Sequence, residues 1–368
     1  MSNLAASKLP LVPWYQSTNV VYIATNTISL VLPSPKTSLE VHPVPVYVPG
    51  PREILIKNEC IALNAIEAKI AIHNVIPYTP YLAILGSTYA GTIASLGPST
   101  PPSLAIGDRV VVSKRFDVKG NQHGAFQRFV ICTDIMVSRV PDAIDLSVPA
   151  SLFMNLTCVV GLFSGRLGLE RPQLDGGVVE DRDQKKKVLV YGGSGSFGGL
   201  SVGYLSQAGY AVVTTSSPPN RAFVEGLGAT AIVDHTQDAQ GLIEQLVEKG
   251  PYDIVVDFVS VASTLAVTGR VVEAQGGGRL FTMQPGREEL PAGVERVFEP
   301  YSESLYEKRN RGLQRWVVEE YLPLGIARGL IKPLPIEKVG GGLKGLNEGL
   351  RKVLEGGSGA RYVVDPWE

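Results

Sequence analysis

The chain is poor in cysteine, and its three cysteines stand far apart. Cys60, Cys132 and Cys158 are odd in number and scattered, which argues against a disulfide framework and favours a reducing compartment. Long apolar runs are also missing, because no uninterrupted segment reaches the roughly 18 residues that a membrane-spanning helix needs. The first ten residues lack a basic flank followed by an apolar stretch. We therefore expect a cytoplasmic protein that makes no contact with membranes.

An excess of charge of one sign is absent as well. The 34 Lys and Arg residues balance 35 Asp and Glu residues, so the formal net charge is −1. Without a broad basic field, nucleic acid and anionic membrane surfaces are not expected partners. What the chain does have is 368 residues with 44% hydrophobic content, which is enough for two domains with their own cores.

The pattern of the chain changes near Pro149. Before it, short strand-like segments alternate with Pro and Gly, which predicts an irregular β-barrel. After it, a helix-compatible stretch runs through Leu169, a polar loop follows, and strands then alternate with helices as in a doubly wound parallel sheet. The strands expected for the barrel are 28–32, 53–57, 90–94, 109–113 and 127–131. Those expected for the parallel sheet are 187–191, 211–217, 231–234, 252–258 and 278–283.

The most informative segment is 187–199, in which an apolar run leads into Gly192, Gly195 and Gly198 and then into a helix expected at about 199–208. A strand that stops at a turn without side chains, followed by a helix N-terminus, is a site for a pyrophosphate. The spacing G-x-x-G-x-x-G differs from the common G-x-G-x-x-G, so an ordinary glycine-rich turn is the alternative. The strand predicted at 211–217 completes a unit of about 30 residues, which favours a dinucleotide site.

The end of that second strand indicates which dinucleotide. A carboxylate there would bind the ribose 2′-hydroxyl of NAD, but none occurs before Glu225. The hydroxyls of Ser216 and Ser217 and the guanidinium of Arg221 could instead bind a 2′-phosphate. NADPH is therefore the expected cofactor. The Ser-Pro-Pro-Asn segment could also simply begin the next helix with Arg221 in solvent, and both readings can hold together.

Several motifs in order along the chain resemble the medium-chain dehydrogenase/reductase superfamily. They are A-L-N-A-I-E-A-K at 62–69, L-G-S-T-Y-A-G-T at 85–92, G-D-R-V at 107–110, G-A-F at 124–126 and the glycine turn. Within the superfamily, the chain is similar to the zinc-independent fungal branch that holds trans-acting enoyl reductases of polyketide biosynthesis. The resemblance implies an α/β protein with a GroES-like β-barrel catalytic domain at 1–150, completed by about 300–368, and a Rossmann NADP-binding domain at 151–299.

The resemblance also implies roles for individual residues. Lys69 matches the motif lysine that lies near the nicotinamide, although on spacing alone it could be an exposed lysine beside a strand. Tyr89 is a second possible proton donor, or a packing residue. His235 would lie against the 2′-phosphate, or merely begin a loop. The remaining assignments are Gly195, Ser196, Phe197 and Gly198 at the pyrophosphate, Pro218, Pro219, Asn220 and Arg221 at the adenosine phosphate, and Met283 and Gln284 at the nicotinamide. Segments 160–167 and 301–305 would line a substrate channel.

A zinc site is not expected. Alcohol dehydrogenases of this superfamily hold catalytic zinc with Cys, His and Cys or Asp, and structural zinc with four closely spaced cysteines. Here the usual Gly-His-Glu is replaced at 85–88, and no histidine lies in a ligand pair. Other departures from the family motifs are Ala65 for proline, Glu67 for aspartate and Thr88 for an acid. These residues surround the presumed reaction centre, so they put its chemistry in question.

Three functions fit these residues. The first is an NADPH-dependent enoyl reductase that acts on a polyketide chain tethered to a carrier protein. The second is a stand-alone quinone or enone reductase, which needs the same cofactor geometry. The third is a non-redox member that binds a metabolite or a protein. The intact glycines of the turn argue against the third, and gene neighbourhood would separate the first two.

Overall fold

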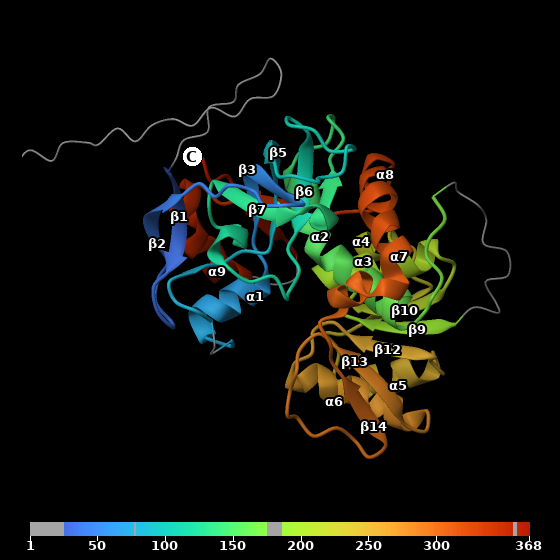
Figure 1. The fold of residues 1–368 in the computed structure, drawn as a ribbon. Helices are drawn as coiled ribbons and strands as arrows, with labels where there is room; N and C mark the ends of the chain where they lie inside the picture. Colours follow the sequence, from blue (N-terminus) through green and yellow to red (C-terminus); the bar gives the residue numbers. More distant parts are fainter. Residues whose placement is uncertain (1–25, 77–78, 175–185, 356–358) are drawn as a thin grey trace, which may run out of the picture.

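The computed structural model describes residues 26–76, 79–174, 186–355 and 359–368. The first ten residues and most of the polar loop expected before the strand at 187–191 lie outside the described residues. The described chain forms a mainly antiparallel barrel and a parallel sheet flanked by helices (Figure 1). Both expected architectures are therefore confirmed.

The barrel is built from strands of both halves of the sequence. Its larger sheet has the order β15-β16-β3-β5-β6-β8 with β7 paired to β3, and a smaller sheet has the order β2-β1-β4. The late strand β16 pairs antiparallel with β3, so Val363 lies opposite Ala62. The tail therefore returns to the barrel. The strands are β1 Asn26–Leu32, β2 Glu40–Pro45, β3 Glu53–Ala62, β4 Ala83–Ile84, β5 Thr88–Leu96, β6 Arg109–Ser113, β7 Phe129–Thr133, β8 Val137–Arg139, β15 Ile336–Lys338 and β16 Arg361–Val364.

The parallel sheet has the strand order β11-β10-β9-β12-β13-β14. In chain order this is 3-2-1-4-5-6, the doubly wound arrangement, in which ligands bind where the order reverses, beyond the carboxyl ends of β9 and β12. The apolar runs explain the strands, because central strands of such sheets are buried on both faces. The strands are β9 Lys187–Tyr191, β10 Ala211–Ser216, β11 Ala231–Asp234, β12 Ile254–Asp257, β13 Gly278–Thr282 and β14 Val294–Val297.

Two helices bear most directly on the site. Helices α2 Ser147–Val160 and α3 Ser196–Gln207 are long, and α2 continues as a π-helical turn at Gly161–Arg166. The other helices are α1 Ala65–Ala68 with a π-helical continuation at Lys69–His73, α4 Arg221–Glu225, α5 Ala239–Glu248, α6 Ala262–Ala274, α7 Arg311–Trp316, α8 Leu322–Ala327 and α9 Leu346–Glu355. The 3-10 turns that contribute to the site are Pro218–Asn220 and Tyr301–Tyr306.

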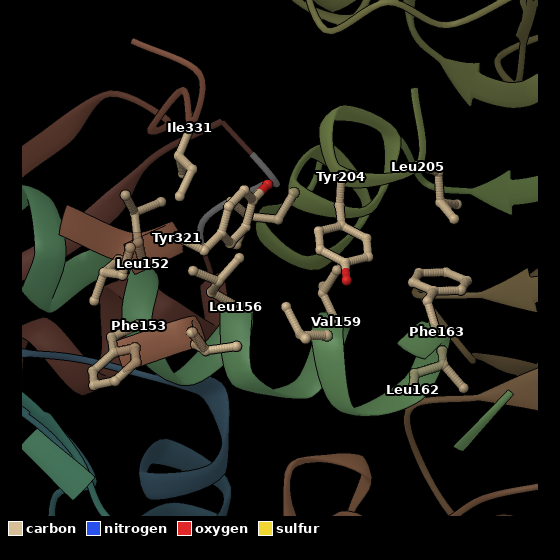
Figure 2. Close-up of a cluster of buried hydrophobic side chains, with 14 of the residues drawn as sticks. Leu152, Phe153, Leu156, Val159, Leu162, Phe163, Tyr204, Leu205, Tyr321 and Ile331 are labelled. Carbon is tan, nitrogen blue, oxygen red and sulfur yellow. The ribbon is translucent and has the colours of Figure 1, made fainter. Parts of the chain in front are cut away.

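Helix α2 joins the barrel to the parallel sheet. Leu152, Leu156 and Val159 lie on one face and point toward Tyr204 and Tyr321 (Figure 2). By length and composition alone, the helical segment Ser147–Arg166 is long and apolar enough to cross a membrane, although polar residues interrupt its apolar sequence. Most of it is buried inside the protein, as in the core helix of a globular protein. Burying these side chains holds the two halves of the molecule against one another.

Candidate active site

The glycine turn between β9 and α3 has the shape that a phosphate group requires. Gly192 has φ +93°, a conformation that side chains rarely adopt, and its N–H donates to Thr215 Oγ1 at 2.9 Å. A Cβ on Gly198 would lie 2.0 Å from the carbonyl oxygen of Gly192, and one on Gly193 would lie 2.2 Å from Thr214 Oγ1. These glycines let helix α3 begin directly against the end of β9.

Helix α3 supplies hydrogen-bond donors at this turn. Its N-cap is Gly195, whose φ of −80° does not itself require glycine. The first N–H groups of any helix lack partners within that helix, and the helix dipole adds positive potential there. No acidic residue lies in the first turn of α3. The turn therefore fits a pyrophosphate.

A cleft of about 470 Å³ opens at this turn, between the parallel sheet and the barrel. Among the predicted residues, Gly192, Gly195, Ser196, Phe197, Gly198 and His235 line it. Ala65, one of the departures placed at the presumed reaction centre, lines it too, whereas the sequence did not indicate the other lining residues, namely Leu63, Tyr191, Ser194, Phe258, Val259, Thr264, Leu334, Val353, Ala360, Arg361 and Tyr362. Phe258 could have been found, because it directly follows β12 at the point where the strand order reverses. It stacks on Phe197 with ring centroids 6.1 Å apart.

The segment expected to hold the 2′-phosphate follows β10 and does not line this cleft. Ser216 is buried and its hydroxyl donates to the carbonyl of Ser217, while Ser217 Oγ accepts from Asn220 Nδ2 at 3.2 Å. Arg221 is exposed and forms an ion pair with Glu225 at 2.9 Å. Pro218 and Pro219 are exposed within a 3-10 turn.

Pairing of β10 with β11 brings His235 near this segment. Ser216 lies opposite Asp234, so His235 follows at the same edge of the sheet as Ser217. His235 is exposed and lines the cleft. An exposed ion pair such as Arg221–Glu225 contributes little to stability, so Arg221 can easily exchange Glu225 for another anion. Ser217, Asn220, Arg221 and His235 are thus grouped where a phosphate could reach them.

Lys69 begins the π-helical turn that follows α1, and its Nζ donates to Gln284 Oε1 at 2.7 Å. The amide nitrogen of Gln284 donates in turn to the carbonyl of Val259, which lines the cleft. The backbone N–H of the neighbouring Met283 donates to Ser260 Oγ. The hydrogen bond between Lys69 and Gln284 joins the barrel to the carboxyl ends of β12 and β13. Partial burial lowers the pKa of the Lys69 ammonium, since desolvation disfavours the charged form.

Buried polar groups lie beside α1. Glu67 Oε2 accepts from the backbone N–H of Asn64 at 3.1 Å, and the Asn64 side chain accepts from Arg361 Nη2 at 2.7 Å. Burial raises the pKa of the Glu67 carboxyl and lowers the pKa of Arg361 to about 10. Thr88 Oγ1 lies 3.4 Å from Asn64 Nδ2. Glu67 and Thr88, which differ from the residues usual at these motif positions, thus belong to a hydrogen-bonded cluster under the cleft.

Tyr89 is not brought to the cleft. Its side chain is fully buried in the barrel core with Ile54, Ile56 and Val112. Burial raises its pKa well above the ordinary value, which makes it a poor proton donor. This position favours the packing alternative for Tyr89 over the catalytic one.

The expected substrate wall forms a tight contact between two segments. Gly161 lies so close to Tyr301 that a Cβ would be 2.1 Å from its carbonyl oxygen, and Ser304 Oγ donates to the Gly161 carbonyl at 2.7 Å. Asn310 Nδ2 donates to the carbonyl of Gly165.

Within the described residues, no group of three His, Cys, Asp or Glu side chains is arranged to hold a metal ion.

Comparisons with known proteins agree with this geometry. A family model described as the alcohol dehydrogenase GroES-like domain matches residues 50–142. The trans-enoyl reductase traG of Penicillium crustosum is 30% identical over 70% of this chain and 70% of its own length. The trans-enoyl reductase himH of Aspergillus japonicus is 29% identical over 89% of this chain and 94% of its own length.

A solved structure shares the fold. The native structure of mycobacterial Rv1454c complexed with NADPH superposes with a TM-score of 0.68 at 19% identity, over 92% of this chain and 100% of that chain. At this identity the likeness shows the fold alone.

Proposed function

Because this chain belongs to the medium-chain dehydrogenase/reductase superfamily of oxidoreductases, we propose that it is an NADPH-dependent, zinc-independent enoyl reductase. In this proposal it acts in trans on polyketide chains tethered to a carrier protein, in fungal secondary metabolism. The observation that carries the proposal is the position of Lys69, which bonds Gln284 beside the cleft that begins at the glycine turn.

The glycine turn supports the choice of a dinucleotide. A Cβ on Gly198 would meet the carbonyl oxygen of Gly192, so glycine there lets α3 begin against the end of β9, where its first N–H groups could bind a pyrophosphate. Ser217, Asn220, Arg221 and His235 would bind the 2′-phosphate, while Met283 and Gln284 would border the nicotinamide. The NADPH bound by the mycobacterial structure is consistent with this cofactor.

The reaction adds a hydride and a proton across an activated C=C bond. A bound NADPH would supply the hydride that the β-carbon takes up. The protonated Lys69 would donate a hydrogen bond to the oxygen of the resulting enolate, or deliver the proton that the α-carbon takes up. Gln284 would hold the Lys69 side chain in place.

Binding and turnover test this proposal together. We expect micromolar NADPH affinity and much weaker NADH affinity by fluorescence or calorimetry, and oxidation of NADPH when an enoyl thioester is added. Faster turnover of carrier-bound than of free thioesters would support action on a synthase. Turnover of quinones or free enones alone would instead identify a stand-alone reductase. No binding of either dinucleotide would contradict both functions and favour a non-redox member.

The cofactor preference is expected to depend on Arg221. Arg221→Ala should weaken NADPH by roughly 10- to 150-fold and leave NADH almost unchanged, because a charge-assisted contact to phosphate contributes roughly 1.5–3 kcal/mol. Titration of both dinucleotides measures this. Arg270→Ala removes a similar exposed ion pair, to Glu273, and serves as the control. Equal loss of both cofactors would argue against a contact between Arg221 and the phosphate.

A further inference from the structure

Ser260, in the turn that follows β12, has a backbone conformation that side chains rarely adopt. Its φ is +55°, in the left-handed region that favours glycine, so serine is less stable there than glycine would be. The residue is buried, and it lies three positions beyond Asp257, the last residue of β12. A strained serine at the edge of a candidate active site indicates a role for its hydroxyl group.

Asp257 fixes the conformation of this turn. Its carboxylate is fully buried, and Oδ1 accepts from the backbone N–H groups of Val259 at 2.9 Å and Ser260 at 2.8 Å. The Ser260 hydroxyl donates to the carbonyl of Asp257 at 2.5 Å. A hydroxyl has one proton to donate and two lone pairs, so this bond fixes its direction and leaves it free to accept from another element.

The group that Ser260 accepts from belongs to the segment after β13. The backbone N–H of Met283 donates to Ser260 Oγ at 2.9 Å. Beside it, Gln284 Nε2 donates to the carbonyl of Val259 at 3.1 Å. Strands β12 and β13 are neighbours in the parallel sheet, so these two bonds join the loops at their carboxyl ends. The turn at 259–260 therefore determines where residues 283 and 284 lie.

The amide of Gln284 passes this position on to Lys69. Gln284 Oε1 accepts from Lys69 Nζ at 2.7 Å. Oε1 and Nε2 belong to one planar amide, so the bond from Nε2 to the Val259 carbonyl also sets the place of Oε1. The ammonium of Lys69, which comes from the other half of the molecule, is thus aligned by the turn that Ser260 holds.

On its other side, the same segment is anchored to the expected substrate wall. Thr282 Oγ1 donates to the carbonyl of Gln284 at 3.0 Å, and the hydroxyl of Tyr301 donates to the carbonyl of Thr282 at 3.0 Å. These bonds do not involve Ser260. Loss of the Ser260 hydroxyl should therefore shift residues 283 and 284 without releasing them from the sheet.

We propose that the Ser260 hydroxyl is a positioning group for the reaction, because it fixes Met283 and Gln284 and, through the Gln284 amide, places the ammonium of Lys69 beside the nicotinamide. This inference rests on the proposed function, since it takes Lys69 as the residue that bonds the enolate or delivers the proton. Ser260 acts through Gln284 and does not itself contact the reacting atoms. None of the sequence motifs identifies it.

Two variants that lack the hydroxyl test the proposal. We expect Ser260→Ala and Ser260→Gly to lower turnover of an enoyl thioester equally, by roughly 10- to 100-fold, because a small misplacement of a reacting group has effects of this size. NADPH affinity, titrated separately, should change little, since the contacts to pyrophosphate and adenosine are untouched. The thermal midpoint should be higher for Ser260→Gly than for Ser260→Ala, because only glycine relieves the strained φ.

A double variant shows whether the effect passes through Lys69. If the hydroxyl acts by placing the Lys69 ammonium, Ser260→Ala should lower turnover no further in a protein that already carries Lys69→Ala. Ser206→Ala is the matched control. It removes a hydroxyl that likewise donates to a carbonyl, that of Gly228 at 2.8 Å, at the end of α3 remote from the glycine turn. Neither turnover nor NADPH affinity should change in this control.

Several results would overturn the proposal. They are unchanged turnover in both Ser260 variants, a loss that follows the thermal midpoint and is smaller in Ser260→Gly, and a loss of full size in the Lys69→Ala background. A fall in NADPH affinity as large as the fall in turnover would also overturn it, because the hydroxyl would then shape the cofactor site. Should Ser260→Ala not fold, Ser260→Gly is measured in both backgrounds and judged in the same way.

Failure of the proposed function has a different signature. It would appear in proteins that keep Ser260, as a wild-type chain that binds no NADPH or as a Lys69→Ala variant with full turnover. Failure of the present inference alone leaves NADPH binding and the loss of turnover in Lys69→Ala intact, and abolishes only the coupling between Ser260 and Lys69. The two failures are therefore distinguishable.

Discussion

Gly198→Ala is expected to lower NADPH affinity on the order of 100-fold, which is equivalent to about 2.7 kcal/mol. The added methyl would lie 2.0 Å from the carbonyl oxygen of Gly192, a backbone atom that cannot turn aside. Helix α3 must therefore move away from β9, and its N–H groups leave the position where they face a phosphate. Overpacking of this kind also costs roughly 1–3 kcal/mol of stability. Calorimetric titration with NADPH and thermal unfolding measure the two effects.

A second glycine of the same helix provides the control. A Cβ on Gly203 would have its nearest neighbour at 3.7 Å, the side-chain nitrogen of Gln207, which is ordinary contact. Gly203→Ala should leave NADPH affinity unchanged and raise stability by up to about 1 kcal/mol, because alanine is the better helix former. If Gly198→Ala bound NADPH as the control does, the glycine turn would not be the pyrophosphate site.

Lys69→Ala is expected to lower turnover by roughly 10²–10⁴-fold, the usual contribution of a positioned acid, while NADPH affinity changes little. Lys69 reaches the site from the barrel, and its Nζ bonds Gln284 rather than the glycine turn. Steady-state kinetics with an enoyl thioester and a separate NADPH titration check this. Lys344→Ala is the control. It removes an exposed lysine far from Lys69 in the sequence and should change neither turnover nor NADPH affinity.

The pH profile gives an independent test of Lys69. Burial lowers the pKa of its ammonium, so the protonated form is lost at a lower pH than for an exposed lysine. If the protonated form acts, turnover falls as the pH rises through that lowered pKa, and this decline should be absent from the residual activity of Lys69→Ala. A decline that persists in the variant would assign the titration to another group and remove Lys69 from the proton step.

The parts of the site that follow from local sequence were predictable. The turn at Gly192 and Gly198 is specified within a few residues, because the positive φ and the close approach of strand and helix allow only glycine. The helix expected at 199–208 begins three residues earlier, at Ser196, since the turn itself supplies its N-cap. The short edge strand β14 was missed because the sequence Val-Glu-Arg-Val is too short to show a period.

Contacts between distant segments were not predictable in the same way. Arg361 reaches Asn64 and Ser151 only because β16 pairs with β3, and no spacing in the sequence encodes that pairing. The alternation of Thr88, Tyr89 and Ala90 along β5 could not show which residue faces the core, because neighbouring strands decide it.

The return of the tail to the barrel constrains the order in which the protein can form during synthesis. The six parallel strands lie in one continuous stretch, from Lys187 to Val297, so this part can form as soon as it has left the ribosome. The barrel sheet lacks β15 and β16 until residues 336–364 have been made, although its other strands emerge first. During vectorial synthesis the Ile61–Ala62 end of β3, which only β16 pairs on that side, therefore stays open while the parallel-sheet half forms, and the barrel half is completed last.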